Sequence, residues 1–237
     1  MSSTYKSVDV LAIGAHPDDV ELGCGGTLVR LAAAGHKVGV IDLSLGELGS
    51  RGTPEQRAEE AARAGTILGL EFRSNLQLKD GDIPVDSGSR TRLIQILRSC
   101  RPKLVLTHHG GGHPDHAKSK QLVEEAVHHS GLSKIETGQP RFRPEKIAFW
   151  IVFNQSIQPA VVVDISDQYQ IKENALRAFQ SQLFSKDSSE PVTYLSDPAF
   201  LEQVRAFHRY LGNLIGRPYG EGFRLSRVPR IADLINC

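Results

Sequence analysis

The sequence VDVLAIGAHPDDVE, residues Val8–Glu21, contains an apolar run that stops at a histidine and two aspartates. Val8–Gly14 has the length and the branched apolar content of a buried strand. The carboxyl ends of parallel strands gather at one edge of an α/β sheet, where ligands bind. We therefore expect His16, Asp18 and Asp19 to lie at that edge.

The rest of the chain alternates strand-length apolar runs with segments of helical period. The expected strands are Val8–Gly14, Val38–Leu45, Glu71–Leu78, Lys103–His108, Lys146–Phe153 and Ala160–Ile165, and the expected helices are Glu21–Ala34, Pro54–Leu68, Ser89–Cys100, Ala117–His129, Asp167–Leu183 and Pro198–Leu214. This order predicts an α/β fold, a Rossmann-like, mostly parallel sheet with helices on both faces, as a single domain over residues 1–237. The Gly/Pro-rich tail from Arg217 is expected to wrap a surface.

Composition narrows the class of protein. Lys plus Arg (28) nearly equals Asp plus Glu (27), so no net field favours nucleic acid or an anionic membrane as partner. No apolar stretch approaches the roughly 20 residues that span a bilayer, and the N-terminus lacks a signal-peptide core. The three cysteines, Cys24, Cys100 and Cys237, form no C-x-x-C pair. These features predict a cytoplasmic protein without a disulfide framework.

A second group, His113-Pro-Asp-His116, follows the strand predicted at Lys103–His108. Zinc binds imidazole nitrogen and carboxylate oxygen, and catalytic zinc sites usually have three protein ligands. His16 and Asp19 are three residues apart at a helix start, so both can face one point. With His116 they form the expected metal site. His108 and His109 also end that strand, but only one can face the cleft, and a structural or surface role is favoured for each.

Three further residues of these groups have the chemistry of amide hydrolysis. Asp18 is placed to take a proton from water, although it could instead be an acid that complements the helix dipole. His113 can hydrogen-bond a developing oxyanion or protonate a leaving amine, and Asp115 can orient His113 or a neighbouring ligand. A dinucleotide site is disfavoured, because acids stand where G-x-G-x-x-G would bind phosphate. Gly23-Cys-Gly-Gly26 comes only after them.

The motifs A-H-P-D-D-x-E at Ala15–Glu21 and H-P-D-H at His113–His116 resemble the LmbE/PIG-L family of zinc-dependent N-acetylglucosamine deacetylases. The resemblance implies that His16, Asp19 and His116 bind one zinc ion per chain. It implies that Asp18 is the general base and that His113 stabilises the oxyanion or acts as the acid.

Three more segments, Gly46–Arg57, Ser181-Gln182 and Tyr219–Phe223, resemble the bacillithiol-biosynthesis branch of that family. The branch's reaction is hydrolysis of N-acetyl-glucosaminyl-malate to glucosaminyl-malate and acetate. By analogy Arg57, and less closely Arg51, bind the substrate; a surface ion pair with Glu60 is the alternative for Arg57. The resemblance also implies a homo-oligomer.

Several alternatives stay open at the level of sequence. The site also suits iron or cobalt, and either Asp18 or His113 could protonate the leaving amine. The substrate could be another glycan, such as a chitooligosaccharide. A metallophosphoesterase would usually need a second metal about 3.5–4 Å away, for which few ligands remain. A non-catalytic sugar-binding module would not need Asp18 and His113.

Overall fold

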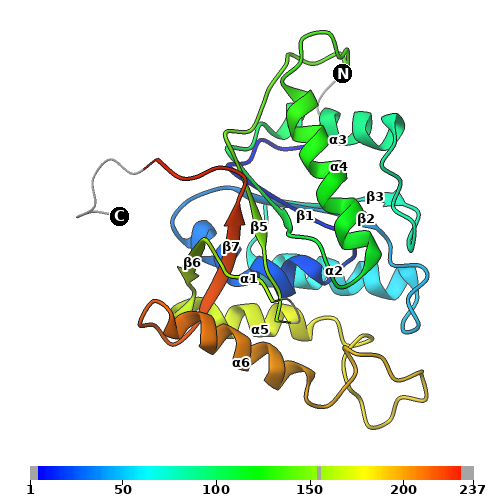
Figure 1. The fold of residues 1–237 in the computed structure, drawn as a ribbon. Coiled ribbons are helices and arrows are strands. Elements are labelled where there is room, and N and C mark those ends of the chain that lie inside the picture. Colours follow the sequence, from blue (N-terminus) through cyan, green and yellow to red (C-terminus); the bar gives the residue numbers. More distant parts are fainter. Residues whose placement is uncertain (1–4, 154–155, 231–237) are drawn as a thin grey trace.

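The computed structural model describes residues 5–153 and 156–230 and has an α/β architecture with helices on both faces of one sheet (Figure 1). The strands are β1 (Val10–Gly14), β2 (Val38–Ser44), β3 (Phe72–Leu78), β4 (Leu104–His108), β5 (Lys146–Trp150), β6 (Val161–Asp164) and β7 (Gly220–Leu225). The α-helices are α1 (Asp19–Ala33), α2 (Pro54–Leu68), α3 (Ser87–Cys100), α4 (Pro114–Ser130), α5 (Tyr169–Arg177) and α6 (Phe200–Asn213).

The strand order in the sheet is β3-β2-β1-β4-β5-β7-β6. The pairings among β3, β2, β1, β4 and β5 are parallel, whereas β7 runs antiparallel to both β5 and β6. The predicted fold class, a mostly parallel sheet in a single α/β domain, is therefore confirmed. Because β1 and β4 are neighbours, the segments that follow them, at His16 and His113, come together at one edge.

The period-2 alternation of β1 divides the core between the two faces of the sheet. Leu11 and Ile13 join a cluster with side chains of α3 and α4. Val10 and Ala12 join a cluster on the opposite face, which includes Cys24 of α1. Cys24 is fully buried and free, while Cys237 lies outside the described residues. None of the helices in the described ranges is long and apolar enough to cross a membrane.

The glycine-rich middle of α1 serves close packing. A Cβ at Gly23 would lie 2.3 Å from Cδ1 of Trp150, and a Cβ at Gly26 would lie 2.8 Å from Cδ1 of Ile165. Side chains at these two positions would push α1 away from the sheet and from the turn before α5. Close packing therefore accounts for the glycines of Gly23-Cys-Gly-Gly26, and a dinucleotide-binding site is not needed to explain them.

The prediction that the tail from Arg217 wraps a surface is wrong, because Gly220–Leu225 is strand β7, which lies between β5 and β6 in the sheet. Two glycines and a glutamate within six residues argue against a strand by propensity. A Cβ at Gly220 would lie 2.5 Å from Cγ1 of Val162, and one at Gly222 would lie 2.9 Å from Cδ1 of Ile151. The glycines therefore allow close approach inside the sheet, which a pattern of local propensities does not reveal.

Glu221 explains why this strand is buried. Its carboxylate accepts hydrogen bonds from the backbone N–H groups of Gly26 (2.9 Å) and Thr27 (2.7 Å) and from Nζ of Lys172 (2.6 Å). Lys172 also donates to the carbonyls of Glu21 (2.9 Å) and Leu22 (2.8 Å). Both charged side chains are buried, at 1% and 0% exposure. We call Lys172, Glu221 and these four backbone groups the Lys172–Glu221 knot; it fixes α1 against α5 and β7.

Candidate active site

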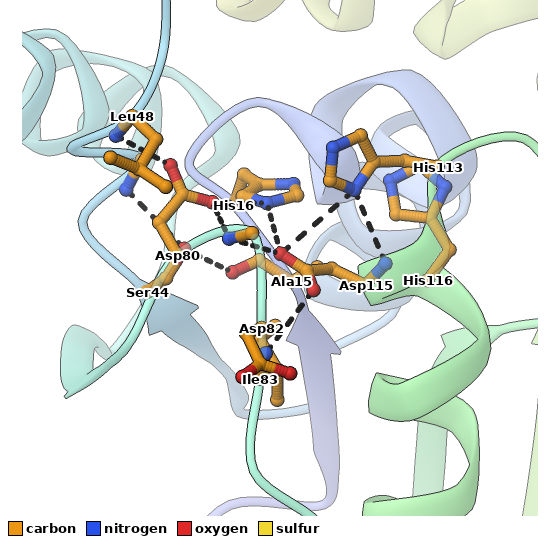
Figure 2. Close-up of polar contacts among 12 residues, drawn as sticks. Ala15, His16, Ser44, Leu48, Asp80, Asp82, Ile83, His113, Asp115 and His116 are labelled. Atoms are coloured by element: carbon orange, nitrogen blue, oxygen red, sulfur yellow. Dashed lines mark hydrogen bonds and ion pairs between the residues drawn. The ribbon is translucent and has the colours of Figure 1, made fainter.

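The His/Asp groups predicted from the sequence meet at the carboxyl ends of β1 and β4, where α1 and α4 begin (Figure 2). They line a cleft of about 590 Å³. Its polar lining consists of His16, Asp18, Asp19, Asp80, His108, His113 and His116, and its apolar lining includes Leu48, Trp150 and Val152. Phe153, Tyr194 and Phe200, whose rings contact one another, form an aromatic wall. The cleft therefore combines charged side chains with an aromatic wall.

His16, Asp19 and His116 form a compact group whose ligand atoms all lie within 4.8 Å of one another. Nδ1 of His16 lies 3.4 Å from Oδ2 of Asp19, and Nε2 of His116 lies 3.2 Å from Oδ1. Asp19 also accepts the backbone N–H of His16 at 2.7 Å, which fixes its carboxylate. The structure thus brings together the three residues predicted as metal ligands, and this group could hold a metal ion.

The outer nitrogens of both histidines already face acceptors. Nε2 of His16 lies 2.9 Å from Oδ1 of Asp80, and Nδ1 of His116 lies 3.2 Å from the carbonyl oxygen of Gly111. A proton on each outer nitrogen leaves the lone pair of the inner nitrogen facing Asp19. Lone pairs that converge on a carboxylate need a cation or a proton between them, so the donor set fits a divalent metal.

The pKa values of His16 and His116 also indicate that this group favours a positive charge. Burial alone lowers the pKa of His16, but its bonds to Asp19 and Asp80 outweigh burial and raise it to about 11. For His116, too, burial opposes protonation, and Asp19 outweighs it to raise the pKa. Conversely, the pKa of Asp19 is held well below its usual range, where the charge of His116 overcomes the effect of burial.

Asp115 supports His16 more closely than His113. Its Oδ2 lies 3.3 Å from Nε2 of His16 and 3.9 Å from Nδ1 of His113. The same carboxylate accepts the N–H groups of Gly81 (2.8 Å) and Ile83 (3.2 Å) and is fully buried (Figure 2). Of the two orientations considered for Asp115, contact with a neighbouring ligand residue is therefore the one observed.

Sequence reasoning missed Asp80. Its carboxylate lies 2.9 Å from Nε2 of His16 and accepts the N–H of Leu48 at 2.8 Å. Its bond to His16 lowers the pKa of Asp80 to about 2, so the group stays ionised. A signal was present in the sequence: Asp80 follows the carboxyl end of β3, and the strand-end rule applies there too.

His108 is the member of its pair that faces the cleft. Its ring stacks on His116 with centroids 4.1 Å apart, and its Nε2 accepts the N–H of Ala15 at 3.1 Å. Burial lowers the pKa of His108 to about 4, which keeps the ring neutral. His109 is half-buried and packs edge-on against Phe149. The prediction that one of the two faces the cleft is confirmed.

Asp18 occupies an unusual backbone conformation at the start of α1, with φ 108° and ψ −27°, and its side chain makes no capping hydrogen bond. As the N-cap residue of α1, Asp18 also stands where an acid complements the helix dipole, the alternative considered for it. Nη2 of Arg57 donates to Oδ2 of Asp18 at 3.2 Å. Burial raises the pKa of Asp18 to about 7 despite the opposing charge of Arg57.

The two arginines expected to bind substrate are engaged by the protein. Nη1 of Arg57 donates to the carbonyl of Gly46 (3.1 Å) and Nη2 to that of Pro17 (2.8 Å), and its Nε is buried. Glu60, the surface partner considered for Arg57, instead accepts the N–H and hydroxyl of Ser181 (2.8 and 2.7 Å).

Arg51 is buried and faces the segment from Ser181 to Pro191. Its five N–H donors meet five acceptors: the carbonyls of Ser181, Leu183, Glu190 and Pro191 and the hydroxyl of Ser188. No donor of Arg51 is left over for a sugar. The structure therefore makes Arg51 a tether of this segment, in contrast to the predicted substrate contact.

His113 is the N-cap residue of α4, and its Nδ1 accepts the N–H of Asp115 at 3.2 Å. An accepting Nδ1 carries no proton, so the neutral ring has its proton on Nε2. Burial and the neighbouring His16 both lower the pKa of His113, which favours this neutral form. Its side chain is half-exposed at the cleft, where the Nε2–H group can serve as a donor.

Fold and site together define a Rossmann-like α/β protein with a His/Asp group able to hold one metal ion at the carboxyl edge of its sheet. A family model described as PIG-L, GlcNAc-PI de-N-acetylase, matches residues 11–127. The diacetylchitobiose deacetylase of Thermococcus kodakarensis is 32% identical, across 94% of this chain and 84% of that protein. This chain belongs to the PIG-L family.

Two further relatives extend the comparison. A 1D-myo-inositol 2-acetamido-2-deoxy-alpha-D-glucopyranoside deacetylase of Saccharopolyspora erythraea is 28% identical, across 80% of this chain and 89% of that protein. The crystal structure of the conserved protein TT1542 from Thermus thermophilus is 38% identical in sequence and superposes with a TM-score of 0.85. That match covers 94% of this chain and 97% of TT1542, so the likeness extends far beyond the His/Asp site.

Proposed function

We propose that this protein is a metal-dependent hydrolase that removes the N-acetyl group from an N-acetylglucosaminyl conjugate. The observation that carries the proposal is the convergence of His16, Asp19 and His116 beside Asp18 and His113 in one cleft. The names of two relatives, both deacetylases of N-acetylated amino sugars, support the same reaction.

His16, Asp19 and His116 are the residues that would hold the metal, with zinc the ion that best suits their donor set. Such an ion would lower the pKa of a bound water toward 7, which would make a nucleophile available near neutral pH. A second group of possible ligands in the described residues, His16, His113 and Asp115, shares His16 with the first. Nε2 of His16 already faces Asp80 at 2.9 Å, which favours one ion over the pair of a metallophosphoesterase.

Asp18 takes the proton of the attacking water as a bond forms to the acetyl carbon. Nε2–H of His113 donates to the carbonyl oxygen as negative charge develops there. The C–N bond then breaks, and the amine leaves with a proton. A neutral His113 would have to become an imidazolate to supply that proton, so Asp18, which holds the proton taken from water, returns it. The products are acetate and a free amino sugar.

The test is a comparison of Asp18→Asn with wild type. We expect kcat to fall about 10²–10⁴-fold, the usual contribution of a general base, while the metal content stays at one ion per chain. Release of a free amine from an N-acetylglucosamine conjugate is the readout. Full activity in Asp18→Asn would remove the assigned base, and a wild-type protein without metal or amine release would reject the function.

The finer substrate is proposed from two directions. Gly46–Arg57 and Tyr219–Phe223 support N-acetyl-glucosaminyl-malate, the substrate of the bacillithiol branch. The cleft supports a second candidate, a neutral glycan such as diacetylchitobiose. Phe153, Tyr194 and Phe200 give the cleft an aromatic wall, and the Arg51 and Arg57 guanidiniums that could have met malate carboxylates already bond to the protein. Aromatic rings suit the apolar face of a sugar.

Initial rates on N-acetyl-glucosaminyl-malate, N-acetylglucosamine and diacetylchitobiose separate these candidates. A neutral aglycone site gives the highest kcat/KM for diacetylchitobiose, and a carboxylate site gives it for the malate conjugate. Tyr194→Ala should lower the diacetylchitobiose value selectively if the aromatic wall binds the second ring, because Tyr194 and Phe153 stack there with centroids 5.8 Å apart.

A further inference from the structure

We propose that Arg57 is a positioning residue that holds the backbone and the carboxylate of Asp18 in the orientation needed to accept a proton. This inference rests on the proposed function, because it concerns the residue assigned there as the base. It gives Arg57 a role different from the substrate contact expected from the sequence.

Asp18 needs an external restraint. Its φ of 108° lies in a region that non-glycine residues rarely adopt and that persists only where the surroundings enforce it, and its side chain has no bond to the helix that it precedes. Arg57 supplies such a restraint from a single nitrogen. Nη2 donates to the carbonyl of Pro17 at 2.8 Å and to Oδ2 of Asp18 at 3.2 Å. It therefore holds both the peptide group that precedes Asp18 and the carboxylate of Asp18.

The surrounding loop is shaped to accept this guanidinium. Nη1 of Arg57 donates to the carbonyl of Gly46 at 3.1 Å. Gly46 has φ 69°, and a Cβ there would lie 2.0 Å from Nη1; a Cβ at Gly49 would lie 3.1 Å from the same atom. The turn after β2 thus leaves no room for a side chain where the guanidinium sits.

Arg57 itself comes from a well-fixed place. It lies near the start of α2, where the hydroxyl of Thr53 caps the helix through the N–H of Gln56 at 3.2 Å. The residue is buried, with an exposed fraction of 5%. Arg57 therefore joins α2, the loop after β2 and the end of β1. A lysine cannot reproduce this, because its single ammonium lacks the planar fork of donors.

The experiment measures kcat and KM for Arg57→Gln and Arg57→Lys on whichever conjugate the wild type hydrolyses fastest. Arg98→Gln is the matched control. Arg98 is equally buried and donates to the carbonyls of Ser130, Leu132 and Ile135, none of which lines the cleft. We expect kcat of Arg57→Gln to fall about 10²-fold, as for a base displaced by about 1 Å, with KM and metal content unchanged. Arg57→Lys should be intermediate, and Arg98→Gln should keep wild-type kcat.

A raised KM with unchanged kcat in Arg57→Gln would instead identify a substrate contact and overturn the proposal, as would a wild-type kcat. If Arg57→Gln does not fold, Gly46→Ala displaces the guanidinium while Arg57 remains, and it should also lower kcat; wild-type kcat there would contradict the role. Failure to find a substrate would count against the proposed function alone. A crystal structure of either variant still tests the role of Arg57, because it needs no substrate. Asp18 should leave the positive-φ region, and an unchanged Asp18 would overturn the proposal.

Discussion

Two clusters of charged residues at α1 contrast in how their charges are neutralised. In the Lys172–Glu221 knot every charged atom meets a partner of the protein itself, and both side chains are sealed from solvent. In the His16–Asp19–His116 group, nitrogen and oxygen lone pairs point at one another beside a cleft. The first cluster is complete and structural, whereas the second is complete only with a cation.

The largest effect that tests this contrast is expected from His116→Ala. Loss of this ligand should remove the metal and several kcal/mol of transition-state stabilisation, on the order of 10⁴-fold in rate. The variant should still unfold at about the same temperature as the chelated wild type, because the substitution removes a member of a crowded polar group and breaks no fully paired interaction. Metal analysis, initial rates and a chelated wild-type control measure this. A variant that keeps its metal would show that His116 is not a ligand.

The next effect concerns the knot. Lys172→Met leaves the Glu221 carboxylate buried without its cation, which should cost about 3–5 kcal/mol of unfolding free energy. For a chain of this size that is a fall in Tm of about 10 °C. The folded fraction should still bind metal. Lys103→Met, which removes an exposed ion pair with Asp9, is the control and should change stability by less than about 1 kcal/mol. Equal effects in both variants would show that the knot is not special.

A smaller effect is expected where α1 meets the sheet. Gly23→Ala places a Cβ 2.3 Å from the ring of Trp150, and overpacking of this kind costs about 1–3 kcal/mol. Gly88→Ala is the control, because Gly88 has no positive φ and a Cβ there would lie 3.4 Å from Oδ1 of Asp86, an ordinary contact. Denaturant unfolding of both variants gives the comparison. A Gly23→Ala protein as stable as Gly88→Ala would mean that α1 can shift.

The smallest effect isolates the strain at Asp18. Asp18→Gly and Asp18→Ala both remove the carboxylate and its bond to Arg57, but only glycine tolerates a φ of 108° without penalty. We expect Asp18→Gly to be more stable than Asp18→Ala by about 1 kcal/mol, although both lack the base. Equal unfolding free energies would show that the backbone relaxes in Asp18→Ala and stores no strain there.

Much of the fold was predictable because its signals are local. Apolar runs of strand length indicated the first six strands, β1 to β6, and the rule that strand ends gather at one edge predicted that His16 and His113 lie close together. The same locality explains the failures. Strand β7 has glycines that only its neighbours justify. Asp80 also follows a strand end, but it stands in a turn without the histidines that mark the other two groups, so its contact with His16 was not predicted.

Arg51 and Arg57 show a second limit of prediction from the sequence. The substrate contacts of Arg57 and Arg51 were expected by analogy with the family branch, and the sequence gives no account of the carbonyl groups that lie near them. Arg51 and Arg57 in fact bond mainly to main-chain oxygens: those of residues 181–191 for Arg51, and those of Pro17 and Gly46 for Arg57. Such acceptors exist only once the loops have folded, so residue type and spacing could not reveal them.

The position of β7 also has a consequence for synthesis on the ribosome. A chain emerging from its N-terminus releases α1, β5, β6 and α5 before Glu221, and until then Lys172 has no carboxylate to meet inside the core. Because β6 pairs only with β7 in the described sheet, it has no hydrogen-bonded neighbour until β7 has been made. Strand β6 therefore joins the sheet later than the parallel strands β1 to β5, although it precedes β7 in the sequence.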